Sequence, residues 1–289
     1  MLFVINPGAG NTNNKSWKES IEQYYQGKDY SIDYFMLPEQ PVSADLKRYI
    51  DDKKPGRVIA VGGDGTVTMV ANIIQGTGIE LGILPGGSAN GMAKELGIPE
   101  EPDEALDITE NGEIRKCDTI LINNKNSCLH LSDIGLNAQL IKYFDEGKLR
   151  GKMGYAKVIL KTLWHKEKMQ VIIHSKALEV RRHAFMVVLA NASKYGTGAV
   201  INPEGKIDDG EFEVIIVRRL SVIALVKMLL KPGPFNPKHI EIFPSTSVEI
   251  TTLKNVHFQI DGEYMGKVNN ITAKIIPGNI KLLLPPLKN

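Results

Sequence analysis

The chain has 289 residues, 43% of them hydrophobic and 24% charged, a composition that excludes wholesale disorder at a length sufficient for two domains. Its 35 basic residues nearly balance 33 acidic ones, and the net charge of +2 argues against a nucleic-acid-binding protein. The longest apolar stretch, residues 220–230, contains Ser221 and Lys227 and is too short to span a bilayer. We therefore expect a cytoplasmic protein, with peripheral contact at the inner face of the membrane as a further expectation.

In the first part of the chain, short apolar runs alternate with amphipathic stretches. This alternation implies parallel strands joined by helical crossovers, and hence a doubly wound α/β domain over residues 1–116. We expect strands over residues 2–5, 31–36, 57–61 and 81–84, and helices over residues 16–26, 43–51, 65–75 and 89–96.

After about residue 115 the pattern changes to strands joined by turns, with only two helical stretches, residues 138–164 and 221–231. The sequence therefore predicts a β-rich, sandwich-like second domain over residues 117–278. A last strand over residues 279–284, within the C-terminal stretch 279–289, could join either domain. The other expected strands are residues 118–122, 127–131, 169–174, 177–180, 183–190, 211–217, 247–252, 256–260 and 271–276.

The segment from Gly62 to Thr66, Gly-Gly-Asp-Gly-Thr, lies directly between an apolar strand and a helix. Glycines there allow backbone amides to approach a ligand, and the helix N-terminus is a natural phosphate-binding position. Asp64 beside a phosphate requires a divalent cation to bridge them. The alternative is a tight turn in which Asp64 only caps the helix.

A second loop, Leu84-Pro85-Gly86-Gly87-Ser88-Ala89-Asn90, also joins an apolar strand to a helix, and Asn6-Pro7-Gly8-Ala9-Gly10 ends the first strand. Loops at the carboxyl ends of strands in a doubly wound sheet line one crevice. Because three loops of small residues follow three different strands, we favour a nucleotide-binding crevice over three independent turns.

Two further segments carry carboxylates beside a glycine. Asp261-Gly262-Glu263 ends an apolar strand, and by itself it is most simply a hairpin turn. Asp208-Asp209-Gly210, downstream of Asn202-Pro203, is also turn-like, although adjacent carboxylates can fold around a cation.

These segments together resemble the lipid kinases that include bacterial diacylglycerol kinases, sphingosine kinases and ceramide kinases. NAD kinases share the Gly-Gly-Asp-Gly-Thr loop, whereas the Pro-x-Gly-Ser-x-Asn block and the late Asp-Gly-Glu separate the lipid kinases from them. The resemblance covers essentially the whole chain and runs in order through Asn6-Pro7-x-x-Gly10, Gly62–Thr66, Pro85-x-Gly87-Ser88-x-Asn90-x-x-Ala93, Asn191 with Tyr195-Gly196-x-Gly198, Pro203 with Asp208-Asp209-Gly210, and Asp261-Gly262-Glu263.

The resemblance implies an NAD-kinase-like α/β domain and a β-sandwich with ATP between them. Glu263, assisted by Asp261, would accept the proton of the lipid hydroxyl, and Asp64 would act through Mg²⁺ or as an alternative base. A Mg²⁺ outside the nucleotide site would be held by Asp209 and the carbonyls of Lys206 and Glu211. The implied ATP-binding residues are Asn6, Gly10, Gly62, Gly63, Asp64, Gly65, Thr66, Val67, Thr68, Met69, Val70, Gly87, Ser88 and Asn90.

Three departures from the family pattern concern the nucleotide contacts. Asn90-Gly91 replaces the usual Asn-Asp, Gly87-Ser88 replaces the commoner Gly-Thr, and the region of Leu37-Pro38 lacks a threonine that often touches the nucleotide. Two alternatives therefore stay open: an NAD-kinase-like enzyme with a soluble substrate, and a catalytically silent nucleotide-binding protein.

A lipid acceptor implies contact with a membrane surface. Basic residues recur between Lys142 and Lys161, interleaved with apolar ones, as in an interfacial helix. We favour the alternative, a solvated helix face packed on the second domain. The sequence leaves the identity of the lipid and the oligomeric state open.

Overall fold

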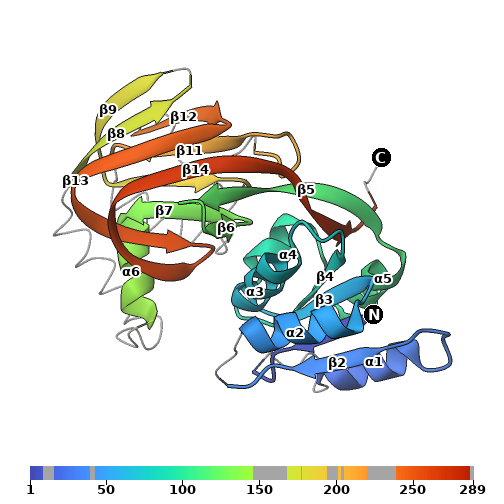
Figure 1. Cartoon of the computed structure of the whole chain (residues 1–289). Helices are drawn as coiled ribbons and strands as arrows, with labels where there is room; N and C mark the ends of the chain where they lie inside the picture. The colour runs from blue at the N-terminus through green and yellow to red at the C-terminus, as the bar shows by residue number, and fades with distance from the viewer. Residues whose placement is uncertain are drawn as a thin grey trace. The chain divides into compact units, whose positions relative to one another are not determined.

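The computed structural model describes residues 1–8, 16–39, 43–145, 168–176, 178–193, 201–202, 205–219 and 239–286. The chain divides into two compact units, whose elements are labelled in Figure 1. Unit 1 comprises Met1–Cys117 and Gly278–Asn289, and unit 2 comprises Asp118–Pro277. No helix in the described part of the chain is long and apolar enough to cross a membrane.

Unit 1 is built on a parallel sheet with the strand order β4-β3-β1-β2. The end of β14 (Glu263–Leu284) adds a further parallel strand, because Lys281 and Leu282 pair with Glu80 and Leu81 of β4. The last expected strand therefore belongs to the α/β unit. The four other strands are β1 (Leu2–Ile5), β2 (Asp33–Met36), β3 (Arg57–Gly62) and β4 (Glu80–Pro85).

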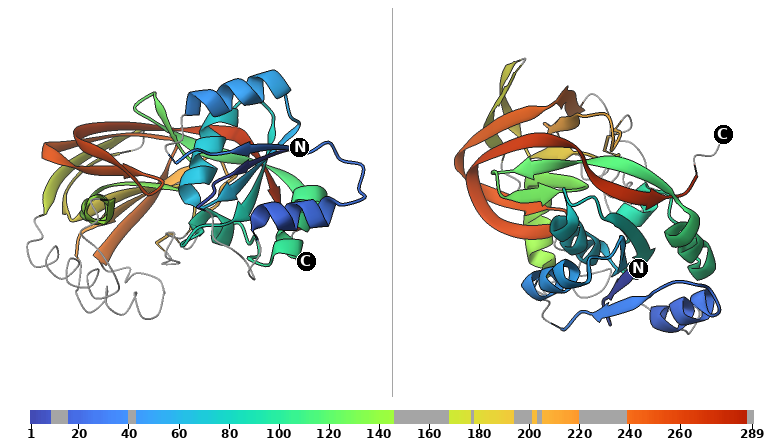
Figure 2. Two further views of the ribbon diagram at one scale, coloured as in Figure 1. Left: turned by 90° about the horizontal axis from the view of Figure 1, so that it is seen from below. Right: turned by 45° about the vertical axis from the view of Figure 1, so that its right-hand side comes forward.

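Helices cover both faces of this sheet, as a doubly wound fold requires. α1 packs against α5 on one face, and α2 packs against α3 on the other (Figure 2). α5 was not expected from the sequence, although Pro102 at its start is typical of a first helical turn. The helices are α1 (Trp17–Tyr25), α2 (Ser43–Lys53), α3 (Asp64–Ile74), α4 (Gly91–Glu95) and α5 (Pro102–Asn111).

Local sequence signals explain where two of these helices lie. α1 begins with a capping box, in which the Ser16 hydroxyl accepts from the Glu19 amide and the Glu19 carboxylate accepts from the Ser16 amide. On α3, Val67, Val70 and Ile74 follow helical spacing and are buried against the sheet.

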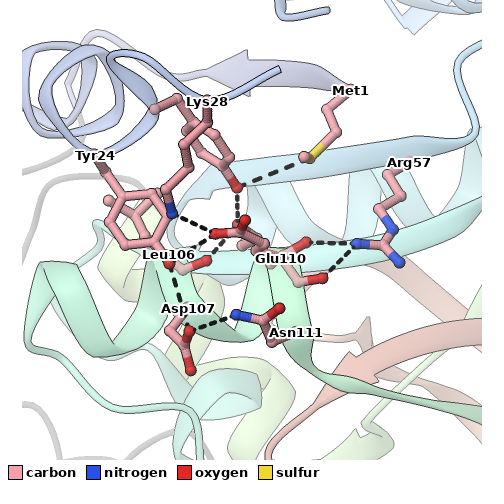
Figure 3. A network of polar contacts seen from close by, with 10 residues as sticks. Met1, Tyr24, Lys28, Arg57, Leu106, Asp107, Glu110 and Asn111 are labelled. Carbon is pink, nitrogen blue, oxygen red and sulfur yellow. Dashed lines mark hydrogen bonds and ion pairs between the residues drawn. The ribbon is translucent and has the colours of Figure 1, made fainter. Parts of the chain in front are cut away.

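A polar network joins the end of α5 to α1 and β3 (Figure 3). Arg57 donates to the carbonyls of Thr109 and Glu110 at 3.0 and 2.9 Å, which satisfies the end of the helix. Glu110 in turn accepts from the hydroxyl of Tyr24 at 3.0 Å and from the ammonium of Lys28 at 2.5 Å. α5 is therefore fixed by directed polar contacts as well as by its apolar face.

Unit 2 is a β-sandwich of largely antiparallel strands with an apolar core that includes Phe212, Val214, Val248, Ile250 and Phe258. It contains one described helix, α6 (Leu136–Asp145). Its strands are β5 (Glu113–Ile122, of which residues 113–117 belong to unit 1), β6 (Asn126–Cys128), β7 (Leu131–Gly135), β8 (Met169–Ser175), β9 (Glu179–Ala184), β10 (Met186–Ala190), β11 (Phe212–Val217), β12 (Ile240–Ser245), β13 (Ser247–Ile260) and the first part of β14.

Several strand expectations for unit 2 need correction. Residues 247–252 and 256–260 form one strand, β13, whose pairing with β14 shifts register between Thr251 and Val256. The strand expected over residues 127–131 is interrupted, because the amides of residues 129–131 turn toward Asp261. β12 was not expected at all. The helix expected over residues 138–164 begins at Leu136 and is described to Asp145, and the helix expected over residues 221–231 lies outside the described residues.

Candidate functional site

The three glycine-containing loops of unit 1 follow neighbouring parallel strands. β1 pairs with β3 through Ile5 and Val61, and β3 pairs with β4 through Gly62 and Pro85. The carboxyl ends of these strands therefore lie side by side, and the expected convergence of the loops is confirmed. Gly10 lies outside the described residues.

The loop after β3 touches the loop after β4 closely enough to require glycine. The Gly86 amide donates to the Gly62 carbonyl at 2.9 Å. A Cβ atom on Gly87 would lie 2.4 Å from the Cα of Gly63, and a Cβ on Gly62 would lie 2.5 Å from the hydroxyl oxygen of Thr66. Because backbone meets backbone at Gly87, the clash could not be relieved by moving a side chain.

Asn6 attaches the loop after β1 to β3 and to the start of α3. Its amide nitrogen lies 3.5 Å from the Thr66 hydroxyl, and its side-chain oxygen accepts from the Gly8 amide at 3.0 Å. The backbone amide of Asn6 also donates to the carbonyl of Val61. A residue expected at the nucleotide thus also organises the loops.

Asp64 caps a helix, but not the helix in which it lies. Its two carboxylate oxygens accept from the amides of Gly91 and Met92, both at 2.9 Å, at the start of α4. Asn90, with a left-handed φ of 52°, accepts from the Gly87 amide at 2.7 Å. Asp64 therefore joins the loop after β3 to the start of α4, and Asn90 holds the loop after β4 in its turn.

The start of α3 is the part of the predicted phosphate site that a ligand could reach. Gly65 is exposed, as is Ser88 in the second loop. The amides of Thr66 and Val67 donate to the Gly63 carbonyl. The amides just before them, of Asp64 and Gly65, are at the position where a helix start leaves N–H groups for a ligand. The side chains of Val67 and Val70 are buried in the core and those of Thr68 and Met69 are partly buried.

In unit 2, Asp261 and Gly262 form the hairpin turn between β13 and β14. Both have positive φ, 47° and 87°, as a two-residue turn of the type I′ class requires. Glu263 follows as the first residue of β14, pairs with Ile260 and is exposed. The turn thus presents Glu263 at the end of a rigid hairpin.

The carboxylate of Asp261 is held by the segment between β6 and β7. It accepts from the amides of Leu129, His130 and Leu131 at 2.8, 2.9 and 3.1 Å, and from the thiol of Cys128 at 3.2 Å. Burial, and then the neighbouring carboxylate, raise the pKa of the Cys128 thiol, so it stays a neutral donor. Asp261 therefore anchors the turn to the segment between β6 and β7, and no sequence pattern predicted these amide contacts.

Two buried polar residues beneath the turn were also missed by the sequence analysis. Asp133 on β7 and Gln259 on β13 face each other across the sheet, and the Gln259 amide nitrogen donates to the Asp133 carboxylate at 2.6 Å. The only sequence signal is a polar residue inside each apolar strand.

The loop predicted to hold Mg²⁺ is described over residues 205–219. The Asp209 carboxylate accepts from the Glu211 amide at 3.2 Å, and buried Asp118 accepts from the Gly210 amide at 2.7 Å. This short loop offers three oxygen atoms as metal ligands, from the Asp209 carboxylate and from the carbonyls of Lys206 and Glu211. Oxygen ligands of these kinds fit a hard divalent cation. No group of three or more His, Cys, Asp or Glu side chains that could hold a metal occurs among the described residues, so such a site depends on backbone carbonyls.

Comparison with known families assigns both parts of the chain. Residues 1–122 match the family described as "Diacylglycerol kinase catalytic domain", and residues 132–284 match the "YegS C-terminal NAD kinase beta sandwich-like domain". The chain is 28% identical over 252 residues to the lipid kinase YegS of Escherichia coli strain K12, which covers 84% of this chain and 83% of the relative.

Solved structures share the fold. A diacylglycerol kinase from Bacillus anthracis str. Sterne has a TM-score of 0.76 and 20% identity, with 99% of this chain and 96% of that chain covered. An NAD kinase from Archaeoglobus fulgidus in complex with ATP has a TM-score of 0.55 and 12% identity, covering 99% of this chain and 94% of that one. At these identities the likeness concerns the fold.

Proposed function

Since the chain belongs to the lipid kinases that combine a diacylglycerol kinase catalytic domain with a YegS-type β-sandwich, we propose that it transfers the γ-phosphoryl group of ATP to a lipid hydroxyl. The observation that carries this proposal is the junction of the loops after β3 and β4. Their backbones meet at Gly63 and Gly87 and leave the start of α3 exposed at Gly65. A helix N-terminus flanked by glycines suits the phosphates of a nucleotide.

The residues of unit 1 position ATP in this proposal. The amides at the start of α3 bind phosphate oxygens, Ser88 offers an exposed hydroxyl, and Asn6 organises the loops from the side of β1. Asp64 keeps the second loop in place through α4. Phosphoryl transfer depends mainly on positioning and charge neutralisation, which suits a site made of backbone amides.

Glu263 is the proposed proton acceptor. Its place directly after the turn leaves it exposed, whereas both oxygens of Asp261 are bound to the amides of residues 129–131. Both oxygens of Asp64 are likewise bound to amides. Glu263 is exposed where a substrate hydroxyl can reach it, whereas both aspartates hold backbone in place, and we therefore assign the role of general base to Glu263.

Mg²⁺ would neutralise charge on the transferring phosphoryl group when it is bound with ATP. Each carboxylate oxygen of Asp64 has lone pairs beyond its single amide bond, so Asp64 fits a role beside the cation. Asp209 with the carbonyls of Lys206 and Glu211 would hold a separate cation that stabilises the loop of residues 205–211. Removal of that cation is then expected to loosen this loop.

A basic hollow in unit 2 supports contact with an anionic membrane surface. It has a volume of about 330 Å³ and opens near the ends of β8, β9 and β11. Arg182 and Arg218 are paired with Glu241, and Arg181 with Glu179, so five lysines and arginines meet two carboxylates. The hollow is lined by Lys168, Arg181, Arg182, His183, Arg218 and Arg219.

The experiment that tests this function is transfer of radiolabelled phosphate from ATP to a panel of acceptors. The panel holds diacylglycerol, phosphatidylglycerol, a sphingoid base and ceramide in mixed micelles, with NAD as the soluble acceptor. We expect label in one lipid and none in NAD. Label in NAD alone would instead identify an NAD kinase, and ATP binding without any labelled product would identify a silent nucleotide-binding protein.

A further inference from the structure

Gln259 connects the hairpin turn that carries Glu263 to the interior of unit 2. Its side-chain oxygen accepts from the Gly262 amide at 2.8 Å, inside the turn. Its side-chain nitrogen donates to the Asp133 carboxylate at 2.6 Å. Because Gln259 is only 1% exposed, its amide group would be left without a water partner if either contact were lost.

The Asp133 carboxylate accepts three hydrogen bonds, and the proposed reaction does not use this residue. Besides Gln259, the Asn137 side chain donates to it at 2.6 Å and the Ala138 amide donates at 3.0 Å. All three partners are donors, two of them to Oδ2 and one to Oδ1, so the ionised carboxylate accepts from all three without giving up an acceptor position to a proton. Asp133 therefore joins β13 to the first turn of α6 through its negative charge.

The charge of Asp133 also determines which way the Gln259 amide points. An ionised carboxylate attracts the amide nitrogen, which leaves the amide oxygen for Gly262. A proton on Oδ2, the Asp133 oxygen that faces Gln259, would turn that oxygen into a hydroxyl donor and would favour the reversed amide. Reversal would place the Gln259 nitrogen against the Gly262 amide, and two donors cannot bond to each other.

We propose that Asp133 and Gln259 are positioning residues for the Asp261-Gly262-Glu263 turn, and that the turn holds Glu263 in its reactive position only while Asp133 is ionised. The effect on catalysis rests on the proposed function, whereas the link between Asp133 and the turn does not.

The surroundings of Asp133 make its proton uptake relevant near neutral pH. Burial raises the pKa of Asp133 to about 6, and the hydrogen bonds from Asn137, Gln259 and Ala138 oppose that rise. β10, which pairs with β7 on the other side, has no titratable residue. The titratable side chains on the other packed elements are His130 before β7, Lys142 and Tyr143 on α6, Glu249, Lys254 and His257 on β13, and Asp261 and Glu263 at the turn.

The first test uses the Gly262 amide as a direct reporter in the wild-type chain. We expect its amide NMR signal to titrate with a midpoint near pH 6, following Asp133. The same signal should lose this transition in Asp133→Asn. A wild-type Gly262 signal that does not change around pH 6 would overturn the proposal, whatever the enzyme phosphorylates.

The second test is kinetic and compares variants at saturating ATP. Gln259→Leu removes both hydrogen bonds, and we expect kcat to fall on the order of 10- to 100-fold, with the KM for ATP changed less than about twofold. Thr252→Val, which removes a buried side-chain hydrogen bond elsewhere on β13, should keep the wild-type kcat. Wild-type kcat in a folded Gln259→Leu variant would contradict the proposal.

A swap of the two side chains separates positioning from general loss of structure. Asp133→Asn and Gln259→Glu alone each leave mismatched donors or acceptors and should lower kcat. In the double variant, Asn at position 133 donates to Glu at position 259, which can still accept from Gly262, and the Asn137 amide turns its oxygen toward the new nitrogen. We expect at least about tenfold recovery over either single variant, and additive losses would count against the proposal.

The two proposals can fail separately. If no lipid or NAD acceptor is labelled by the wild-type chain, the proposed function fails while the Gly262 titration still decides the structural link. If a lipid is labelled but Gly262 does not titrate, the function stands and the inference about Asp133 fails.

Discussion

Asp64 and Asp261 are acidic residues in motifs that indicate phosphoryl transfer, and each uses its carboxylate to hold backbone. Asp64 accepts from Gly91 and Met92, and Asp261 accepts from three consecutive amides that begin at Leu129. In both cases the side chain fixes a loop or a turn next to the residues that we expect to contact substrate. Their loss would therefore disturb the site through its geometry as well as its charge.

The contact between Gly63 and Gly87 leads to a prediction about ATP binding. Gly87→Ala would place a Cβ 2.4 Å from the Gly63 backbone and force the two loops apart. We expect ATP with Mg²⁺ to stabilise the wild type, by about 2.7 kcal/mol at a hundredfold excess over Kd, and to give little stabilisation in Gly87→Ala. Thermal unfolding with and without ATP measures this.

Gly56→Ala is the matched control for this prediction. Gly56 lies in the same unit, does not have positive φ, and a Cβ there meets nothing within 4 Å. It should keep the full ATP-dependent rise in Tm. An equal rise in Gly87→Ala would show that close approach of the loops is not needed for nucleotide binding.

At the level of elements, the end of α5 is fixed by two charged side chains, Lys28 just after α1 and Arg57 on β3. The hydrogen bond from Lys28 is the main reason that the pKa of Glu110 lies below its ordinary value. Arg57 completes the arrangement by binding the last carbonyls of the helix and the Glu80 carboxylate. These contacts make the attachment of α5 depend on the ionisation of Glu110.

The Glu110 contacts predict a pH-dependent contribution to stability. Because the pKa of Glu110 is lower in the folded state, its contribution is present above the ordinary value of 4.5 and is lost as the pH falls through the folded value. Glu110→Gln should lower the free energy of unfolding by about 1 kcal/mol at neutral pH, and the difference should vanish in acid.

Denaturant unfolding of the wild type and Glu110→Gln at neutral and acidic pH measures this difference. Glu100→Gln changes a carboxylate whose ion pair with Lys94 is largely exposed, so it should cost much less. A Glu110 effect that is the same at both pH values would show that the Lys28 contact does not depend on charge.

Elements with a clear local pattern could be predicted from the sequence, whereas long strands and tertiary contacts could not. The apolar runs of β1, β3 and β4 and the helix α3 appear at nearly the expected residues. Two strands were expected over residues 271–276 and 279–284, on either side of Pro277 and Gly278, yet one strand, β14, runs without a break from Glu263 to Leu284.

The residues of the candidate site also divide into those that the sequence identifies and those that only the structure reveals. Motif residues such as Gly62, Gly87 and Asp261 were identifiable, because glycines and Asp-Gly turns have distinctive local requirements. Asp133 and Gln259 were not identifiable, because their importance arises from pairing across 126 residues of sequence. A polar residue within an apolar strand is a weak signal until its partner is known.

At the scale of the whole molecule, nearly balanced total charge conceals a local excess of positive charge in unit 2. We expect this basic hollow to bind anionic vesicles. Arg181→Glu with Arg219→Glu should weaken binding to phosphatidylglycerol vesicles by at least about tenfold, since each basic residue near the surface contributes about 1 kcal/mol. Sedimentation with vesicles at constant ionic strength measures the change.

The control reverses two exposed lysines of unit 1, Lys18→Glu with Lys47→Glu, and changes the net charge by the same amount. This variant should bind vesicles nearly as well as the wild type. Equal weakening in both variants would mean that total charge, and not the hollow, controls membrane binding.

In the proposed reaction, this chain phosphorylates a lipid hydroxyl with Glu263 as proton acceptor. The most direct measurement is the rate at which radiolabelled phosphate from ATP enters the lipid fraction in the wild type and in Glu263→Gln, with Glu249→Gln as an exposed carboxylate control on β13. We predict labelled lipid with the wild type and the control, and a loss of roughly a hundred- to ten-thousandfold in kcat with Glu263→Gln. A Glu263→Gln variant that labels lipid at the wild-type rate, or a wild type that labels none, would contradict it.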